Sequence, residues 1–155
     1  MSADLDRLGR AYWRLAADTG ARMAFACDAD NDDVLAIAEE EGTFLTQAFF
    51  VLMFGVLEHQ INLLAAAQVP DARRDAMRGS AFANRLDSAI KVATEVLGDS
   101  HAVEIAKARE QIIDWYSSRN DIAHGEPRTR LLDIVSLLQG ARMISALLSK
   151  VQGAI

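Results

Sequence analysis

The chain is poor in cysteine, in proline and in apolar runs of membrane length. The shortage of cysteine and of long apolar runs excludes disulfide-bonded and membrane-spanning classes of protein. Its 155 residues include one cysteine, Cys27, which cannot form an internal disulfide, and two prolines. The N-terminus, MSADLDRLGR, lacks the apolar segment of a secretory signal. The longest strongly apolar run, Ala48 to Leu57, is about half of the roughly 20 residues that span a bilayer. We therefore expect a cytoplasmic protein with no membrane span.

Positive charge is also scarce, since the formal net charge is -6. Nonspecific affinity for nucleic acid comes mainly from Lys and Arg side chains that neutralise phosphates, so the balance argues against a general nucleic-acid coat and leaves local sites open. Arginines gather in two places, at Arg73, Arg74, Arg78 and Arg85 and again at Arg119, Arg128 and Arg130. We interpret the first group as a solvated helix face.

What the sequence does contain is apolar residues at helical spacing. Apolar residues make up 51% of the chain, enough for one domain with its own core. They recur at steps of three and four, as in Leu5, Leu8, Tyr12 and Leu15, and nowhere alternate as in a strand. The spacing predicts helices over residues 3–26, 33–41, 43–68, 81–97, 100–124 and 127–151. We expect an all-α fold, an antiparallel helical bundle with a four-helix core and additional short helices, forming a single domain over residues 1–155.

Helix ends are predicted from glycines and small polar residues. Gly42, Gly98 and Gly125 are expected to end helices, and Ser80 is a good N-cap for the helix that follows it. The acidic segment Asp28–Asp33 resembles a calcium loop but has Asp33 where that loop needs a glycine. We favour an interhelix turn in which Asp32 or Asp33 caps the next helix. No metal and no cofactor are expected.

Two polar residues, Glu58 and His59, interrupt the apolar helix expected over 43–68. A carboxylate buried in such a helix is costly unless a cation or hydrogen-bond donors meet it. Glu58 therefore lies either on a wet stripe of the helix or at a functional place. The residues leave both possibilities open.

The stretch SSRNDIAHGEP, residues 117–127, concentrates polar side chains at the end of a long predicted helix. Arg119 and His124 there could form an ordinary helix terminus, with Arg119 near the negative end of the dipole and His124 bonded to a last carbonyl. However, continuing the apolar stripe of this helix past Tyr116 leads to Arg119 and Asn120. An arginine for phosphate charge beside an imidazole for proton transfer is the chemistry of phosphodiester cleavage.

At these residues the sequence resembles the HEPN superfamily (higher eukaryotes and prokaryotes nucleotide-binding), whose motif is R-x(4–6)-H. Arg119, Asn120 and His124 match the motif, including the polar residue that commonly follows the arginine, and the Glu58-bearing helix is similar as well. The resemblance implies a metal-independent endoribonuclease, in a toxin–antitoxin or phage-defence setting, that binds RNA. The alternative is a noncatalytic helical module that binds a nucleotide or a partner protein.

From this resemblance we expect the RNA 2'-hydroxyl to attack the adjacent phosphate and leave a 2',3'-cyclic phosphate. Arg119 would stabilise the developing charge, His124 would move a proton, and Glu58 would face Arg119 and hold its guanidinium. Because each chain offers one histidine at the motif, we predict a homodimer through the Arg119/His124 face. An antitoxin or nucleotidyltransferase partner is also implied, although Glu126 stands where the tyrosine modified by such transferases would be.

Overall fold

The computed structural model describes residues 2–67, 69, 81–125 and 133–155. The five α-helices in these residues are α1 (Ser2–Asp28), α2 (Asp32–Ala67), α4 (Phe82–Leu97), α5 (Ala102–Ala123) and α6 (Ile134–Ala154). A short 3₁₀ turn, η1 (Asp99–His101), precedes α5, and the described residues contain no strand. The prediction of an all-α helical bundle is confirmed.

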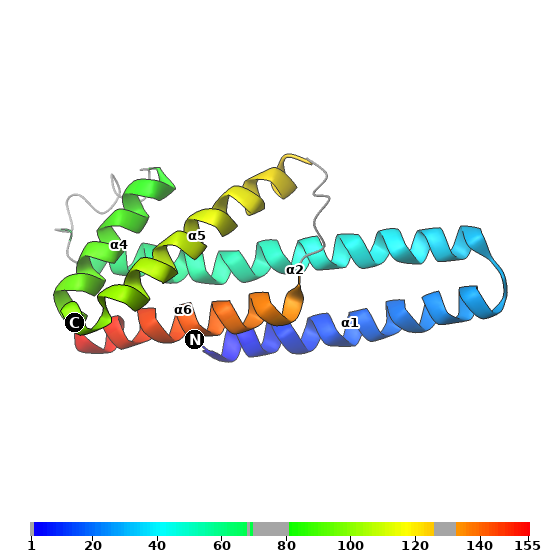
Figure 1. Cartoon of the computed structure of the whole chain (residues 1–155), viewed down its shortest axis with the longest axis horizontal. Helices are drawn as coiled ribbons and strands as arrows, with labels where there is room; N and C mark the ends of the chain where they lie inside the picture. Colours follow the sequence, from blue (N-terminus) through cyan, green and yellow to red (C-terminus); the bar gives the residue numbers. More distant parts are fainter. Residues whose placement is uncertain (1, 68, 70–80, 126–132) are drawn as a thin grey trace.

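The first two helices form a long antiparallel hairpin whose tip projects beyond the other helices (Figure 1). The least exposed positions of α1 follow a seven-residue repeat of the coiled-coil type. These positions are Leu5, Gly9, Tyr12, Ala16, Thr19, Met23 and Ala26. The predicted stripe was wrong at Leu15, which is 51% exposed, since the repeat places Ala16 against α2 instead.

The helix α2 is continuous, and the prediction of a break at Gly42 was wrong. Gly42 keeps a helical backbone, and a Cβ built on it would lie 3.6 Å from the Thr19 Cγ2 atom of α1. That distance is ordinary van der Waals contact, so this glycine lies inside a continuous helix beside α1 and does not end one. Next to it, Thr43 and Thr46 donate hydroxyl hydrogen bonds to the carbonyls of Glu39 and Gly42, at 3.1 and 2.9 Å.

The turn between α1 and α2 is closed by an asparagine. Asn31 Oδ1 accepts a hydrogen bond from the Val34 amide at 3.1 Å, so the expected cap by Asp32 or Asp33 was wrong. Asp30 has a positive φ of 52°, a conformation that Asp tolerates better than most residues. In the described part of the chain, no three His, Cys, Asp or Glu side chains are grouped to hold a metal ion.

The central helix is α2, which packs against α1, α4, α5 and α6. Its fully buried side chains include Phe50, Met53, Phe54, Leu57 and Ile61. By length and composition alone α2 and α6 could each cross a membrane, and 50% and 56% of their apolar windows are buried inside the bundle. The core helix of a globular bundle has the same properties, so the absence of a membrane span stays a prediction.

The remaining helix ends follow the turn chemistry only in part. Gly98 and Gly125 have φ values of 68° and 74° directly after α4 and α5, as expected of helix-ending glycines. Ser80, Arg73, Arg74 and Arg78 lie outside the described residues, and α4 begins after Ala81 without a side-chain cap. The start predicted for the last helix, at residue 127, also lies outside them.

Asp133 marks the beginning of α6. Its backbone is extended, and its carboxylate accepts hydrogen bonds from the amides of Val135 and Ser136, so the described helix starts at Ile134. The hydrogen bond from the Ser136 hydroxyl, together with those from the two amides, holds the pKa of Asp133 below its ordinary value of 3.8. This cap is therefore a charged one at neutral pH.

Candidate functional site

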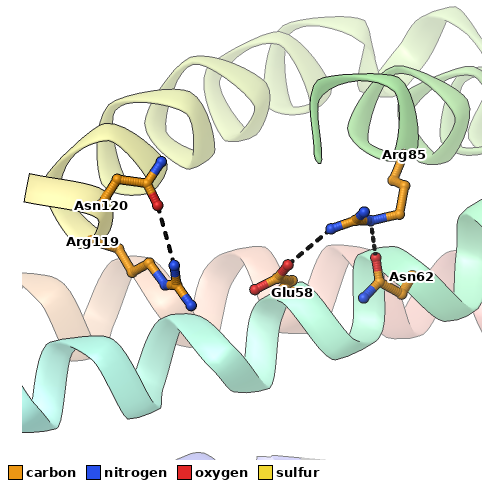
Figure 2. Close-up of polar contacts among 5 residues, drawn as sticks. All are labelled: Glu58, Asn62, Arg85, Arg119 and Asn120. Carbon is orange, nitrogen blue, oxygen red and sulfur yellow. Dashed lines mark hydrogen bonds and ion pairs between the residues drawn. The ribbon is translucent and has the colours of Figure 1, made fainter. Parts of the chain in front are cut away.

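The end of α5 presents Arg119 and Asn120 toward α2 (Figure 2). Both side chains are half-buried, as expected where a polar pair continues an apolar stripe. Arg119 Nη1 donates to Asn120 Oδ1 at 3.2 Å, and no described carboxylate forms an ion pair with this guanidinium. A guanidinium has five N–H donors, so most of them remain available to a ligand.

His124 is the C-cap residue of α5, and its exposed side chain has no hydrogen-bond partner among the described residues. The helix end is closed by backbone groups, because the His124 amide donates to the Asn120 carbonyl at 2.9 Å and the Gly125 amide to the Ile122 carbonyl at 3.1 Å. The helix end therefore does not need the imidazole of His124 to bond a last carbonyl, which is the role that an ordinary helix terminus would give it.

Glu58 is not the partner of Arg119. Its Oε1 atom accepts a hydrogen bond from Nη2 of Arg85 at 3.0 Å, with the two side chains only 25% and 14% exposed. In Figure 2 Glu58 lies between the two arginines and its contact is drawn to Arg85. The prediction that Glu58 holds Arg119 was thus wrong, and so was the interpretation of Arg85 as part of a solvated face.

Arg85 is held by groups from two helices. Its Nε donates to Asn62 Oδ1 at 2.7 Å, and its Cζ lies 5.7 Å from the centre of the Phe82 ring. Phe82 stacks on Tyr116 of α5 with ring centres 4.2 Å apart. Asn62 was missed by the sequence reasoning, although its spacing of four residues from Glu58 puts both on one face of α2. This cluster joins α2, α4 and α5.

A groove of about 490 Å³ crosses α2 beside Arg119. Its lining residues are Asp4 of α1, Val51, Leu52, Gly55, Val56, His59 and Gln60 of α2, and Arg119 of α5. His124 is not among them. The histidine that shares a groove with Arg119 is therefore His59, which is exposed and to which the sequence reasoning gave no separate role.

The charged groups around Arg119 determine which kind of ligand its guanidinium can bind. Of the described arginines, Arg85, Arg109 and Arg119 are partly buried. Arg85 and Arg109 form ion pairs with carboxylates, at 3.0 Å in each case, whereas among the described residues Arg119 bonds only the neutral amide of Asn120. A partly desolvated guanidinium without a carboxylate can bind an anion, and phosphate suits its planar fork.

No family model, curated protein or solved structure matches this chain. The resemblance to the HEPN superfamily therefore rests on the residues from Arg119 to His124 and on the order of the helices.

Proposed function

We propose that this protein is a metal-independent endoribonuclease of HEPN type that acts in a toxin–antitoxin or phage-defence setting. The observation that carries the proposal is the half-buried Arg119, whose guanidinium lies beside a groove without a carboxylate partner among the described residues. Such a cation can stabilise the charge that develops on a phosphate when the RNA 2'-hydroxyl attacks it. The products are a 2',3'-cyclic phosphate and a 5'-hydroxyl.

His124 is the residue proposed to move a proton in this reaction. Its imidazole is exposed, it is not needed for the cap of α5, and it follows Arg119 by little more than one helical turn. Asn120 orients the guanidinium through the hydrogen bond at 3.2 Å. Glu58 acts indirectly, because its ion pair with Arg85 helps to fix the place of α4 and not the guanidinium of Arg119.

A homodimer forms part of the proposal, since one motif histidine per chain leaves the proton donor and acceptor to be shared between two chains. Exposed apolar side chains on α2 support an interface near the groove. Ile37, Phe44 and Leu52 are 57%, 73% and 59% exposed, and their spacing of seven and eight residues puts them on one face. Leu52 also lines the groove with Arg119. A second copy of the chain bound to this face would therefore bring the two candidate sites, one in each chain, close together.

The same apolar face favours one other function, a noncatalytic module that binds a partner protein. Exposed apolar residues aligned on a single helix face are typical of surfaces that other proteins cover. An antitoxin or a nucleotidyltransferase would be such a partner. RNA cleavage decides between the two functions, because the module would bind its partner without cutting RNA.

The test is cleavage of a labelled RNA by the purified protein in EDTA. We expect cleavage with wild type, none with His124→Ala, and a rate lower by roughly 10²-fold with Arg119→Lys, which keeps the charge and loses the planar fork. Arg109→Lys is the matched control, because Arg109 is also a partly buried arginine of α5, but it pairs with Asp87 of α4 and does not line the groove. Mass spectrometry should find a cyclic phosphate, which is lighter than a linear one by one water.

Two results would reject the ribonuclease. One is wild-type protein that is folded by circular dichroism and leaves RNA intact; the other is cleavage that neither His124→Ala nor Arg119→Lys changes. Light scattering tests the dimer separately, and a monomer at micromolar concentration would contradict it.

A further inference from the structure

The groove beside Arg119 has a gap in its wall at a glycine. Gly55 lies in the interior of α2, where glycine is the least favourable residue after proline. A Cβ built on Gly55 would meet no atom within 4 Å, so no neighbouring helix requires the missing side chain. The apolar side chains of Val51, Leu52 and Val56 border the open space that Gly55 leaves. The groove is thus wider than any other residue at this position would allow.

The polar groups of the groove are divided between acceptors and donors. Gln60 is fully buried, and its Nε2 atom donates to Ser145 Oγ at 2.9 Å. Its Oε1 atom is buried without a hydrogen-bond partner in the described part of the chain, and because protein atoms enclose it, it is not exposed to a ligand in the groove. Asp4 provides an acceptor, while Arg119 provides N–H donors and positive charge.

A ligand that complements this groove combines a flat apolar body, N–H donors and an anionic group. A nucleotide has all three, in the faces of its base, the amino or imino groups of the base edge, and the phosphate. A protein segment would offer donors and apolar surface but would need an acidic side chain at the one place where Arg119 lies. The arrangement favours a nucleotide because its phosphate can bind the planar fork of Arg119 through two oxygens while its base supplies the flat apolar body and the N–H donors.

We propose that this groove is a base-binding subsite that holds one nucleotide of a single-stranded RNA, with the base over Gly55 and its phosphate on Arg119. The inference rests on the proposed function for the class of ligand, and it adds the place and the recognition of the base. The exposed carboxylate of Asp4 accepts from the base edge, so guanine, with two neighbouring N–H donors, is the preferred base. His59 borders the sugar and phosphate.

The experiment fills the groove and measures RNA binding. Gly55→Leu places a side chain into the open space, and Gly20→Leu is the matched control. Gly20 is also exposed in the interior of a helix, α1, and a Cβ there meets no atom within 4 Å, but it does not line the groove. Both variants gain helix propensity, and both are made in a His124→Ala background so that the RNA stays intact.

Binding is followed by the fluorescence anisotropy of a short labelled single-stranded RNA rich in guanine, and of an abasic chain with the same phosphates. We expect Gly55→Leu to weaken RNA binding by about tenfold or more, the scale of one lost base contact. Abasic binding should change little, and Gly20→Leu should match its parent on both ligands. If Gly55→Leu does not fold, Leu52→Ala, which trims an exposed wall of the groove, should weaken RNA binding in the same selective way.

The outcomes separate this inference from the proposed function. RNA affinity that Gly55→Leu leaves unchanged, in a protein whose wild type cleaves RNA, overturns the subsite and keeps the ribonuclease. Selective loss of RNA binding in a protein that never cleaves RNA supports the subsite and rejects the ribonuclease. No binding of RNA by the parent, or equal loss on RNA and abasic chains, overturns the subsite.

Discussion

Removal of the Glu58 carboxylate should destabilise the bundle more than removal of any solvent-exposed acid on the same helix. In Glu58→Ala the Arg85 guanidinium, whose side chain is only 14% exposed, loses the carboxylate that lies 3.0 Å from its Nη2 atom. Hydrogen bonds to charged groups contribute about 1.5–3 kcal/mol, and loss of one partner of a fully buried ion pair costs about 3–5 kcal/mol. Because Glu58 is 25% exposed and Asn62 still bonds Arg85, we expect about 2 kcal/mol.

This free energy converts to a shift in melting temperature. Globular proteins unfold with an entropy of about 2.1 cal/mol/K per residue, so a loss of about 2 kcal/mol in a chain of 155 residues lowers the Tm by about 6 °C. The matched control is Glu41→Ala, also in α2, whose ion pair with Arg22 is 43% and 55% exposed and should be worth less than about 1 kcal/mol. Thermal unfolding followed by circular dichroism measures both variants.

Equal Tm values for Glu58→Ala and Glu41→Ala would refute the reasoning. A third variant, with Glu58→Leu and Arg85→Met together, tests its cause. Replacing both partners of a buried ion pair by apolar residues is often neutral or stabilising, so this double variant should recover part of the loss seen in Glu58→Ala. Failure to recover would place the stabilisation in another contact of Glu58.

Two further predictions concern α6. Asp133→Ala should lower the Tm at neutral pH, and the difference in Tm from wild type should shrink as the pH falls below 3.8. The reason is that a group with a lowered folded-state pKa stabilises the fold only while its carboxylate is ionised. A difference in Tm that is the same at neutral pH and below pH 3.8 would contradict a charged cap. Gly140→Ala should cost about 1–3 kcal/mol in chemical denaturation, because its Cβ would lie 2.9 Å from Trp115 Cη2, whereas Gly153→Ala, which meets no atom within 4 Å, should not destabilise the protein.

The sequence predicts the helices well because their apolar spacing is a local property. Gly98 and Gly125 end helices as expected, since each takes a positive φ that other residues avoid. Gly42 is a glycine of the same kind in the sequence, but α2 continues through it, and no local pattern distinguishes the two cases. Whether a glycine ends a helix is therefore not decided by its presence in the sequence alone.

The polar residues of the candidate site were likewise predictable only where a local property decides their place. The sequence left open whether Glu58 lies on a wet stripe or is buried with a partner, and the ion pair with Arg85 shows the second case. The identity of that cation was missed, since Arg85 and Arg119 are both distant in sequence and only the packing of α4 and α5 on α2 decides between them. The groove at Gly55 depends on residues from three helices and could not be predicted from spacing along one.

Three consecutive residues of α2 connect the candidate site to the rest of the bundle. Successive helical side chains point about 100° apart, so Glu58, His59 and Gln60 face three different directions. Glu58 meets Arg85 of α4 and Gln60 meets Ser145 of α6, while His59 remains in the groove with Arg119. A displacement of α4 or α6 therefore strains the segment of α2 that forms the groove.

The position of Arg119 depends on the same contacts from the other side. Tyr116, one turn before Arg119 on α5, stacks on Phe82, and Phe82 lies in turn against the Arg85 guanidinium that bonds Glu58. The chain of contacts from Glu58 through Arg85 and Phe82 to Tyr116 thus links α2 to α5 through α4, beside the direct contact between the rings of Tyr116 and Phe54 of α2, whose centres lie 6.0 Å apart. Glu58 is accordingly connected to the helix that carries Arg119 without touching the guanidinium itself.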